Sequence, residues 1–322
     1  MNVRGTAGRD AWLDGLRALA ALMVFVHHAT PGTYLGGWDA GVLVFFTLSG
    51  YLLYRPFLQG PVDVRAYAIR RVLRIYPAYL VAAVGIAVLN GYDLDPMGVI
   101  TMGNTTVIVA WTLQIEVVFY LLLPLIAWIA HGQRPALLAM AAISLSIGAA
   151  ELIGTHVFPG AFATWAWAFV PGMILAQVAV TRPDLLRRAS SWVVPLAGLC
   201  LLAISVVPDI KWPDIPSAAG SALLLAWLLT RPAPSARIAG VMLVGGALSY
   251  SFYLWHEALM AVDRPVSPVG ILLALLISGS VAAVSYVVVE RPAIQLARRL
   301  TTRRVPQAAS APAAVAASSA EA

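Results

Sequence analysis

The chain has 322 residues, of which 60% are hydrophobic and only 11% are charged. Soluble domains carry about 25% charged residues, so this composition excludes an ordinary soluble domain and predicts an all-α, polytopic transmembrane helical bundle. The net charge of +6 arises mainly from arginines between apolar segments, where the positive-inside rule explains them, so no nucleic-acid partner is expected. The single cysteine, Cys200, excludes a disulfide framework and a thiolate metal site, and no metal is expected.

Apolar segments of membrane-spanning character recur along the chain, and we predict about ten spans. Nearly all of the 21 Lys and Arg residues fall on one side of the membrane if the N-terminus is cytoplasmic. This asymmetry predicts cytoplasmic N- and C-termini in a multi-pass protein of the plasma membrane. The expected spans are residues 12–30, 38–58, 73–90, 107–130, 136–153, 162–180, 192–207, 215–230, 240–262 and 268–289.

The spans divide the chain into three expected regions. Residues 1–11 form a cytoplasmic N-terminal leader, and residues 12–293 form one membrane domain with short loops and no extracytoplasmic domain. Residues 294–322 end in an Ala/Ser/Pro-biased run without apolar periodicity, which predicts a disordered cytoplasmic tail.

The first span carries an unusual number of polar side chains for a membrane helix. Such side chains are costly in hydrocarbon unless they face protein or water, so this helix is a candidate for chemistry. Arg17 and His28 are about three turns apart, so they lie within roughly 20° of one face and about 16 Å apart along the axis. The polar residues of this span are Asp14, Arg17, His27 and His28.

Two later spans bring further polar groups to a similar expected depth. In the predicted orientation, Glu116 lies in the outer half of the fourth span and His256 near the outer end of the ninth. A histidine near a carboxylate can take a proton from a hydroxyl, so Glu116 and His28 are the favoured functional candidates. For Glu257 and His27, close to the membrane surface, structural pairing is the preferred interpretation.

A basic run begins the third expected span. Arg71 and Arg74 are three residues apart and share a helical face, where two guanidinium groups can hold phosphate oxygens in bidentate fashion. Spacing alone does not separate this role from that of positive-inside anchors next to the interfacial Tyr76 and Tyr79. Both interpretations stay open on the spacing.

Six short segments carry a resemblance to a known family: LDGLRALA…HHA, FFTLSGYLL, RRVLRIYPAYL, WTLQIEVVFYLLLP, LSYSFYLWHE and VVVERP. In this order on a ten-helix pattern, they resemble the acyltransferase 3 family of integral-membrane O-acyltransferases. The resemblance covers about residues 12–293. Members of this family modify bacterial surface polysaccharides, lipopolysaccharide, peptidoglycan and some secreted glycosides and antibiotics.

The resemblance implies roles for particular residues. The family's arginine and histidine in the first helix correspond to Arg17 and His28 rather than to His27. Its paired arginines correspond to Arg71 and Arg74, which favours donor binding over membrane anchoring for these two residues.

A further family motif ends in a glutamate. That glutamate corresponds to Glu116, which here follows Trp111 and Thr112, with threonine in place of the commoner serine.

The resemblance also implies the reaction. An acyl group would pass from acyl-CoA, arriving from the cytoplasm, to a hydroxyl of a carbohydrate, a glycolipid or a glycosylated secondary metabolite. No permanently bound cofactor is expected. Direct transfer and a transient acyl group on His28 both remain open. A transporter or flippase of a glycan or lipid-linked substrate is the alternative from another class, because transporters also bury ionisable residues.

The expected catalytic residues follow from both arguments. His28 is the general base, and Glu116 or Asp14 orients it. Arg17 either stabilises the donor or holds Asp14 in a buried pair. The expected donor- and substrate-binding residues are Arg71, Arg74, Arg70, Trp111, Tyr120 and His256.

Three remaining polar residues receive structural interpretations first. Ser49 precedes Gly50 without the flanking glycines of a nucleophile elbow, so close helix packing is favoured over nucleophilic chemistry. Tyr120, one turn beyond Glu116, is expected to hydrogen-bond to it. Glu290 closes the last span, where a structural salt bridge is the first expectation and a contribution to the donor site the second.

Overall fold

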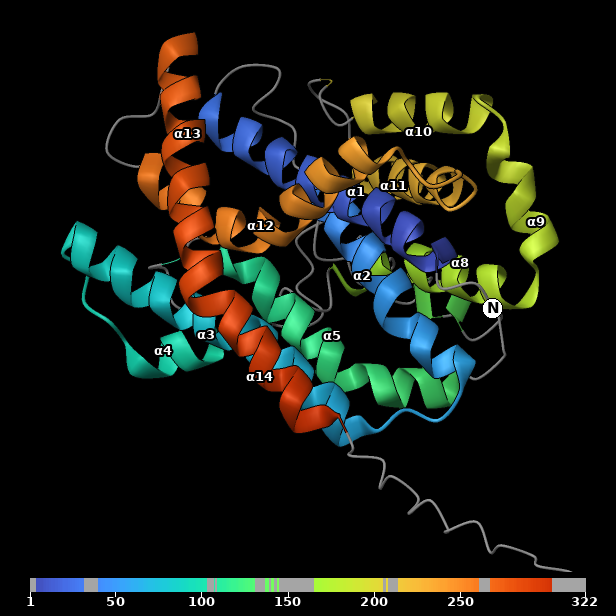
Figure 1. Cartoon of the computed structure of the whole chain (residues 1–322), viewed down its shortest axis with the longest axis horizontal. Coiled ribbons are helices and arrows are strands. Elements are labelled where there is room, and N and C mark those ends of the chain that lie inside the picture. Colours follow the sequence, from blue (N-terminus) through green and yellow to red (C-terminus); the bar gives the residue numbers. More distant parts are fainter. Residues whose placement is uncertain are drawn as a thin grey trace, which may run out of the picture.

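The computed structural model describes residues 4–31, 40–102, 107, 109–130, 137–138, 140–141, 144, 165–204, 207, 214–260 and 267–302. Every regular element within these ranges is helical, which confirms the all-α prediction for the described part of the chain (Figure 1). A π-helical turn, η4 (Tyr286–Glu290), joins the last two helices. The α-helices are α1 (Arg4–Ala29), α2 (Ala40–Gln59), α3 (Val64–Asn90), α4 (Pro96–Thr101), α5 (Ala110–Ile129), α8 (Val170–Thr181), α9 (Pro183–Arg187), α10 (Val193–Ile204), α11 (Asp214–Leu228), α12 (Ala236–Met260), α13 (Pro268–Ser285) and α14 (Arg291–Thr301).

Several helices have the length and composition of membrane spans. Among the described residues, five stretches qualify, namely α2, α3, α5, α12 and the continuous α13–α14 stretch, and the bent pair α9–α10 would add a sixth. The chain is therefore a multi-pass membrane protein, whereas the total of about ten spans and the cytoplasmic termini stay predictions. The expected span 136–153 lies mostly outside the described residues.

Helix α3 begins at Val64, well before the expected start at residue 73. The Asp63 side chain caps it by accepting a hydrogen bond from the Ala66 amide at 3.0 Å. The helix thus starts before the expected apolar span, because this cap lies in a polar stretch that an apolar-span criterion does not include. As a result, Arg71 and Arg74 lie about two turns inside a helix rather than at its start.

The last helix also continues further than expected. The chain passes from α13 through η4 into α14 and stays helical to Thr301, beyond the end of the last expected span at residue 289. Pro292 does not stop the helix because it occupies the first turn of α14, where a missing amide proton is tolerated. Residues 303–322 of the predicted tail lie outside the described residues.

Helices α1 and α12 cross in close contact (Figure 1). A Cβ atom on Gly246 would lie 2.3 Å from the Cβ of Asp14, so the crossing requires glycine at this position. Gly245 faces Ala18 along the same crossing. Small residues thus let the polar side chains of α1 lie directly against α12.

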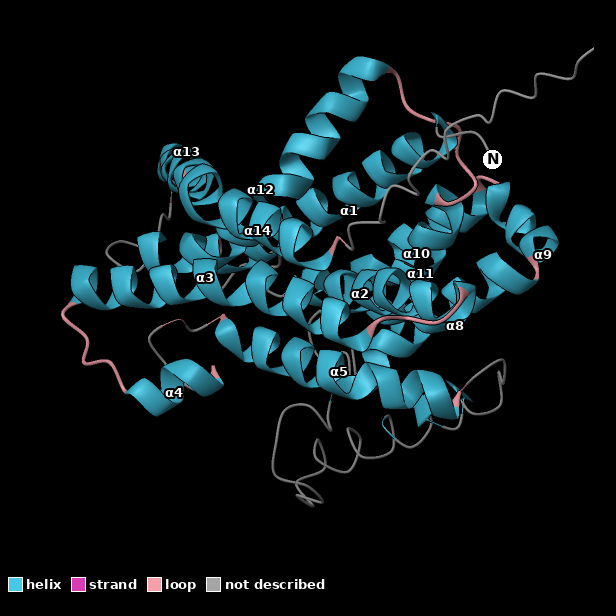
Figure 2. Cartoon of the chain, turned by 60° about the horizontal axis from the view of Figure 1, so that its bottom comes forward, coloured by secondary structure: helices cyan, strands magenta, loops and turns pink. Residues whose placement is uncertain are grey.

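Helix α2 packs against α1, α5, α8 and α11 and forms the centre of the bundle (Figure 2). Leu43, Leu48 and Tyr54 are among its fully buried side chains. A Cβ atom on Gly50 would lie 2.0 Å from the carbonyl oxygen of Phe169, which confirms close helix packing in this segment. With neighbours on several sides, α2 provides a fixed wall for the site described next.

Candidate active site

A cavity of about 330 Å³ lies between α1, α2, α3, α5 and α12. Apolar side chains of α2 form part of its wall, and all five helices contribute polar groups. Residues far apart in the sequence therefore converge on one space. The predicted site residues that line it are Arg17, Arg71, Arg74, Glu116 and Tyr120, and the other polar lining residues are Ser49, Thr112, Ser249, Tyr250 and Tyr253.

Arg74 is held by a buried carboxylate at the π-helical turn. Its Nη1 lies 2.6 Å from Oε1 of Glu290, whose other oxygen accepts a hydrogen bond from Ser251 Oγ at 2.9 Å. The guanidinium group also lies over the Tyr250 ring, 5.9 Å from its centroid. The expected structural salt bridge of Glu290 is thus confirmed, and its partner is a residue of the predicted donor site.

Arg71 differs from Arg74 in its partners. Among the described residues it forms no ion pair, and its buried Nε atom has no hydrogen-bond partner. Its guanidinium group lies over the rings of Tyr67 and Tyr120, with centroid distances of 5.8 and 5.7 Å. The positive charge of Arg71 is therefore oriented by aromatic faces and remains free to meet an anion in the cavity. Arg70 is exposed and is not among the cavity residues.

Arg17 forms an ion pair with Asp14 within α1. Arg17 Nη1 donates to Asp14 Oδ1 at 2.7 Å, so the expected pair of Arg17 with Asp14 forms, although it is half-buried rather than buried. Asp14 is thus paired with Arg17 in the first half of α1, whereas His28 lies at the C-terminal end of the same helix. Its expected role as an orienting group for His28 does not fit this arrangement.

Glu116 lies in the cavity with two hydroxyl partners. It accepts a hydrogen bond from Ser49 Oγ at 2.7 Å and another from Tyr120 Oη, which confirms the expected contact with Tyr120. The packing interpretation of Ser49 was incomplete, because Gly50 makes the close helix contact while the Ser49 hydroxyl binds Glu116. The described hydrogen bonds of Glu116 thus go to hydroxyl groups of α2 and α5, and the expected pairing of Glu116 with His28 stays a prediction.

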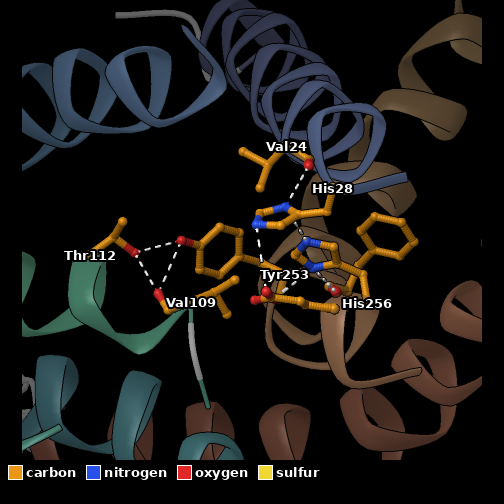
Figure 3. Close-up of polar contacts among 8 residues, drawn as sticks. Val24, His28, Val109, Thr112, Tyr253 and His256 are labelled. Carbon is orange, nitrogen blue, oxygen red and sulfur yellow. Dashed lines mark hydrogen bonds and ion pairs between the residues drawn. The ribbon is translucent and has the colours of Figure 1, made fainter. Parts of the chain in front are cut away.

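His28 instead belongs to a cluster between α1 and α12 (Figure 3). Its Nδ1 lies 2.9 Å from the carbonyl oxygen of Val24 and 3.3 Å from Nε2 of His256. Its Nε2 lies 3.8 Å from Oε1 of Glu257. The carboxylate beside His28 is therefore Glu257, for which the sequence favoured a purely structural pairing, rather than Glu116 or Asp14. The His28 side chain is 25% exposed, so a ligand can reach it.

Tyr253 stands between the cavity and this histidine cluster. It lines the cavity, and its hydroxyl lies 2.7 Å from Thr112 Oγ1 and 3.1 Å from the carbonyl oxygen of Val109. Its ring centroid is 5.8 Å from that of His256. Figure 3 shows the Tyr253 ring between the Thr112 hydroxyl and the two histidines. Tyr253 therefore contacts both the cavity and the histidine cluster.

Two of the residues expected to bind donor or substrate, Trp111 and His256, lie outside the cavity. Trp111 packs against Trp165, with ring centroids 5.6 Å apart, and His256 is fully buried beside His28. Neither residue is among those that line the cavity. Of the six predicted binding residues, only Arg71, Arg74 and Tyr120 reach it.

The sequence contained a signal that Glu257 lies near His28. Glu257 directly follows His256, and both belong to the segment YLWHE at the expected depth of His28. A carboxylate near a membrane surface is usually an ordinary solvated group, so depth alone did not reveal that it faces His28.

The fold and the site together define a membrane protein with a cation-lined internal cavity and an adjacent histidine–carboxylate pair. The chain belongs to the acyltransferase 3 family, because the family model described as an acyltransferase domain matches residues 10–290. It is accordingly an acyltransferase of the membrane, which implies an acyl donor and a hydroxyl acceptor.

Three curated relatives illustrate the family. Nodulation protein 10 of Rhizobium leguminosarum bv. viciae is 25% identical, over 93% of this chain and 97% of its own. A Bacillus subtilis protein provisionally named a peptidoglycan O-acetyltransferase is 25% identical, over 91% of this chain and 56% of its own. A Komagataeibacter xylinus protein provisionally named a membrane-bound transacylase is 25% identical, over 89% of this chain and 83% of its own. No solved structure matches the chain.

Proposed function

We propose that this protein transfers an acyl group from acyl-CoA to a hydroxyl of a carbohydrate, a glycolipid or a glycosylated secondary metabolite at the plasma membrane. The observation that carries the proposal is that one helix, α1, takes part in both halves of the site. Arg17 of α1 lines the arginine cavity, and His28 of the same helix meets Glu257 at the adjacent cluster. Helix α1 thus fixes the position of His28 relative to the donor site.

The donor half of the site suits the phosphates of acyl-CoA. Arg71, with its unpaired guanidinium group, is the first candidate to bind phosphate oxygens in bidentate fashion. Arg74 can join it if the phosphate displaces the Glu290 carboxylate. Glu116 contributes by holding the Tyr120 hydroxyl, which keeps the Tyr120 ring beneath Arg71. The pantetheine arm would then run past Tyr253 towards His28.

The catalytic half depends on which nitrogen of His28 carries the proton. A carbonyl oxygen only accepts hydrogen bonds, so the contact of Nδ1 with the Val24 carbonyl supports a proton on Nδ1. Nε2 is then the basic nitrogen, and it faces Glu257. When Nε2 takes up a proton, the nearby carboxylate stabilises the resulting imidazolium ion.

The reaction then balances with the residues of this chain. The acceptor hydroxyl gives its proton to His28 Nε2 while its oxygen bonds to the thioester carbonyl carbon. The carbon–sulfur bond breaks as the tetrahedral intermediate collapses, and the CoA thiolate takes the proton back from Nε2. The covalent route, with the acyl group briefly on His28, would use the same Nε2 as nucleophile.

A carbohydrate acceptor is supported only by relatives. The Bacillus subtilis relative bears the name of a peptidoglycan O-acetyltransferase, and peptidoglycan is a hydroxyl-rich polymer outside the plasma membrane. The cavity of this chain is too small to enclose such a polymer, so the acceptor would present one hydroxyl at the exposed edge of His28.

The test is a transfer assay with the purified protein in lipid nanodiscs. Radiolabelled acetyl-CoA is mixed with a panel of oligosaccharides, peptidoglycan fragments, glycolipids and glycosides, and label in the acceptor is measured. We expect transfer to at least one acceptor class by the wild-type protein and its loss in folded His28→Ala. No transfer to any acceptor, or equal transfer by His28→Ala, would overturn the proposal.

A further inference from the structure

His256 is a fully buried histidine whose two ring nitrogens both have partners. Its Nδ1 lies 2.8 Å from the carbonyl oxygen of Tyr253 and 3.2 Å from that of Phe252. Its Nε2 lies 3.3 Å from Nδ1 of His28. The sequence pointed to His256 as a substrate-binding residue, but its nitrogens face protein groups instead of the cavity.

The carbonyl oxygens determine where the protons of both rings lie. Because carbonyls only accept hydrogen bonds, Nδ1 of His256 must carry the proton that these contacts need. In neutral His256, Nε2 then has a free lone pair, and it points at Nδ1 of His28. That atom is protonated, because it also faces a carbonyl, that of Val24. The two rings therefore fit as donor and acceptor, with the His28 Nδ1 proton shared between Val24 and His256.

The ring of His256 has little freedom to leave this arrangement. It stacks on Phe252 with a centroid distance of 5.9 Å and an interplanar angle of 12°, and Phe25 of α1 lies 6.4 Å away. A flip of the ring would point a carbon at the Tyr253 carbonyl and lose the hydrogen bond between Nδ1 and that oxygen. The acceptor that faces His28 is thus fixed by packing as well as by hydrogen bonds.

We propose that His256 is a positioning residue that, as a neutral acceptor, holds the proton of His28 on Nδ1 and keeps Nε2 free for the reaction. The inference rests on the proposed role of His28 as base or nucleophile. It assigns to an imidazole the orienting role that a carboxylate has in a Ser-His-Asp triad. When His28 becomes an imidazolium ion, its Nδ1–H bond to His256 becomes charge-assisted and therefore stronger. Consecutive residues of α12 then serve the two nitrogens of His28, His256 at Nδ1 and Glu257 at Nε2.

The direct test is ¹⁵N NMR of the full-length protein with labelled histidine in nanodiscs. The chain has only five histidines, so the His28 signals can be assigned by loss in His28→Ala. We expect the proton of His28 on Nδ1 in the wild type and a shift towards Nε2 protonation in His256→Leu. A wild-type His28 with its proton on Nε2 would overturn the inference, whatever the behaviour of any variant.

Kinetics provide the second readout. His256→Leu should lower kcat about tenfold with the donor KM within about twofold, because the variant alters the base and leaves the arginine cavity intact. His256→Gln should retain kcat within about threefold, because its amide oxygen can accept the same proton. Leu254→Ala, which removes buried volume from the same helix without touching His28, is the packing control. If His256→Gln and His256→Leu lower kcat equally, or if Leu254→Ala lowers kcat as much as they do, His256 is only a core residue.

The two hypotheses fail separately in these experiments. If folded His28→Ala transfers acyl groups as well as wild type, the proposed function fails even when the tautomer is as expected. If His28→Ala is inactive but His256→Leu retains both the wild-type tautomer and the wild-type kcat, the proposed function survives and the role of His256 is refuted.

Discussion

The arginine cavity and the histidine cluster are built in opposite ways. Five helices contribute to the cavity, and one of its arginines, Arg74, is paired with a carboxylate far away in the sequence, Glu290. The cluster needs only α1 and α12, and its two α12 residues, His256 and Glu257, are neighbours in the chain. The donor site therefore depends on the assembly of the whole bundle, whereas the base depends on one helix crossing.

This difference predicts that the two regions respond to different substitutions. Buried ion pairs are costly to break because they leave an uncompensated charge, so changes in the cavity affect both binding and stability. The cluster is held by hydrogen bonds of the two histidine rings, by ring packing and by the contact of His28 with Glu257, so changes there affect the chemical step with less loss of stability. Helix α1 contributes to both regions. A substitution at its crossing with α12 can therefore impair donor binding and the chemical step together.

The largest effect is expected at the cluster. His28→Ala should lower kcat by about a thousandfold, within the range of general acid–base catalysis, while the donor KM changes little. The adjacent His27→Ala is the matched control, and its kcat should stay within about tenfold of wild type. Steady-state kinetics with labelled acyl-CoA measure both. An equal loss of kcat in the two variants would mean that His28 is not the catalytic base.

The second effect is expected in the cavity and should have the opposite kinetic signature. Replacement of both Arg71 and Arg74 by alanine should raise the donor KM about 100-fold, because hydrogen bonds to charged groups contribute about 1.5–3 kcal/mol each. Arg70→Ala removes a positive charge from the same helix at an exposed position outside the cavity. Its donor KM should change less than twofold. If Arg70→Ala raises the donor KM as much as the double substitution does, Arg71 and Arg74 are membrane anchors rather than donor-binding residues.

A third substitution tests the crossing that joins the two regions. Gly246→Ala would place a Cβ 2.3 Å from that of Asp14, so α1 must shift and the free energy of unfolding should fall by about 1–3 kcal/mol. Gly240→Ala lies on the same helix in open space, and there alanine should be neutral or stabilising by up to about 1 kcal/mol. Thermal unfolding in detergent compares the two. In Gly246→Ala, donor KM and kcat should both worsen; a change in only one of them would show that α1 does not couple the regions.

The sequence was a good guide to which residues matter and a poor guide to their partners. Arg17, Arg71, Arg74, Glu116 and Tyr120 were all expected in the site, and all line the cavity. Spacing on a helix gives the depth and face of a side chain, and the family motifs then select among neighbours. This information does not give the rotation of one helix relative to another.

The errors have that common physical origin. Glu116 and His28 reach a similar expected depth, but Glu116 turns towards Ser49 of α2 whereas His28 turns towards Glu257 of α12. The carboxylate that pairs with Arg74, Glu290, is the last residue of the π-helical turn η4. Nothing in the local composition of that segment predicts such a turn.

The smallest effect is expected where the two regions meet, at the Tyr253 hydroxyl. Tyr253→Phe keeps the ring against His256 and removes the hydroxyl that contacts Thr112 and the Val109 carbonyl. It should therefore cost about 1 kcal/mol of unfolding free energy and leave kcat within about threefold. A double-mutant cycle with Thr112→Val should give a coupling energy of about 0.5–1.5 kcal/mol, since the two hydroxyls share one hydrogen bond. A large loss of kcat in Tyr253→Phe would mean that this hydroxyl takes part in the chemistry, and the cavity and the cluster would then be one site rather than two.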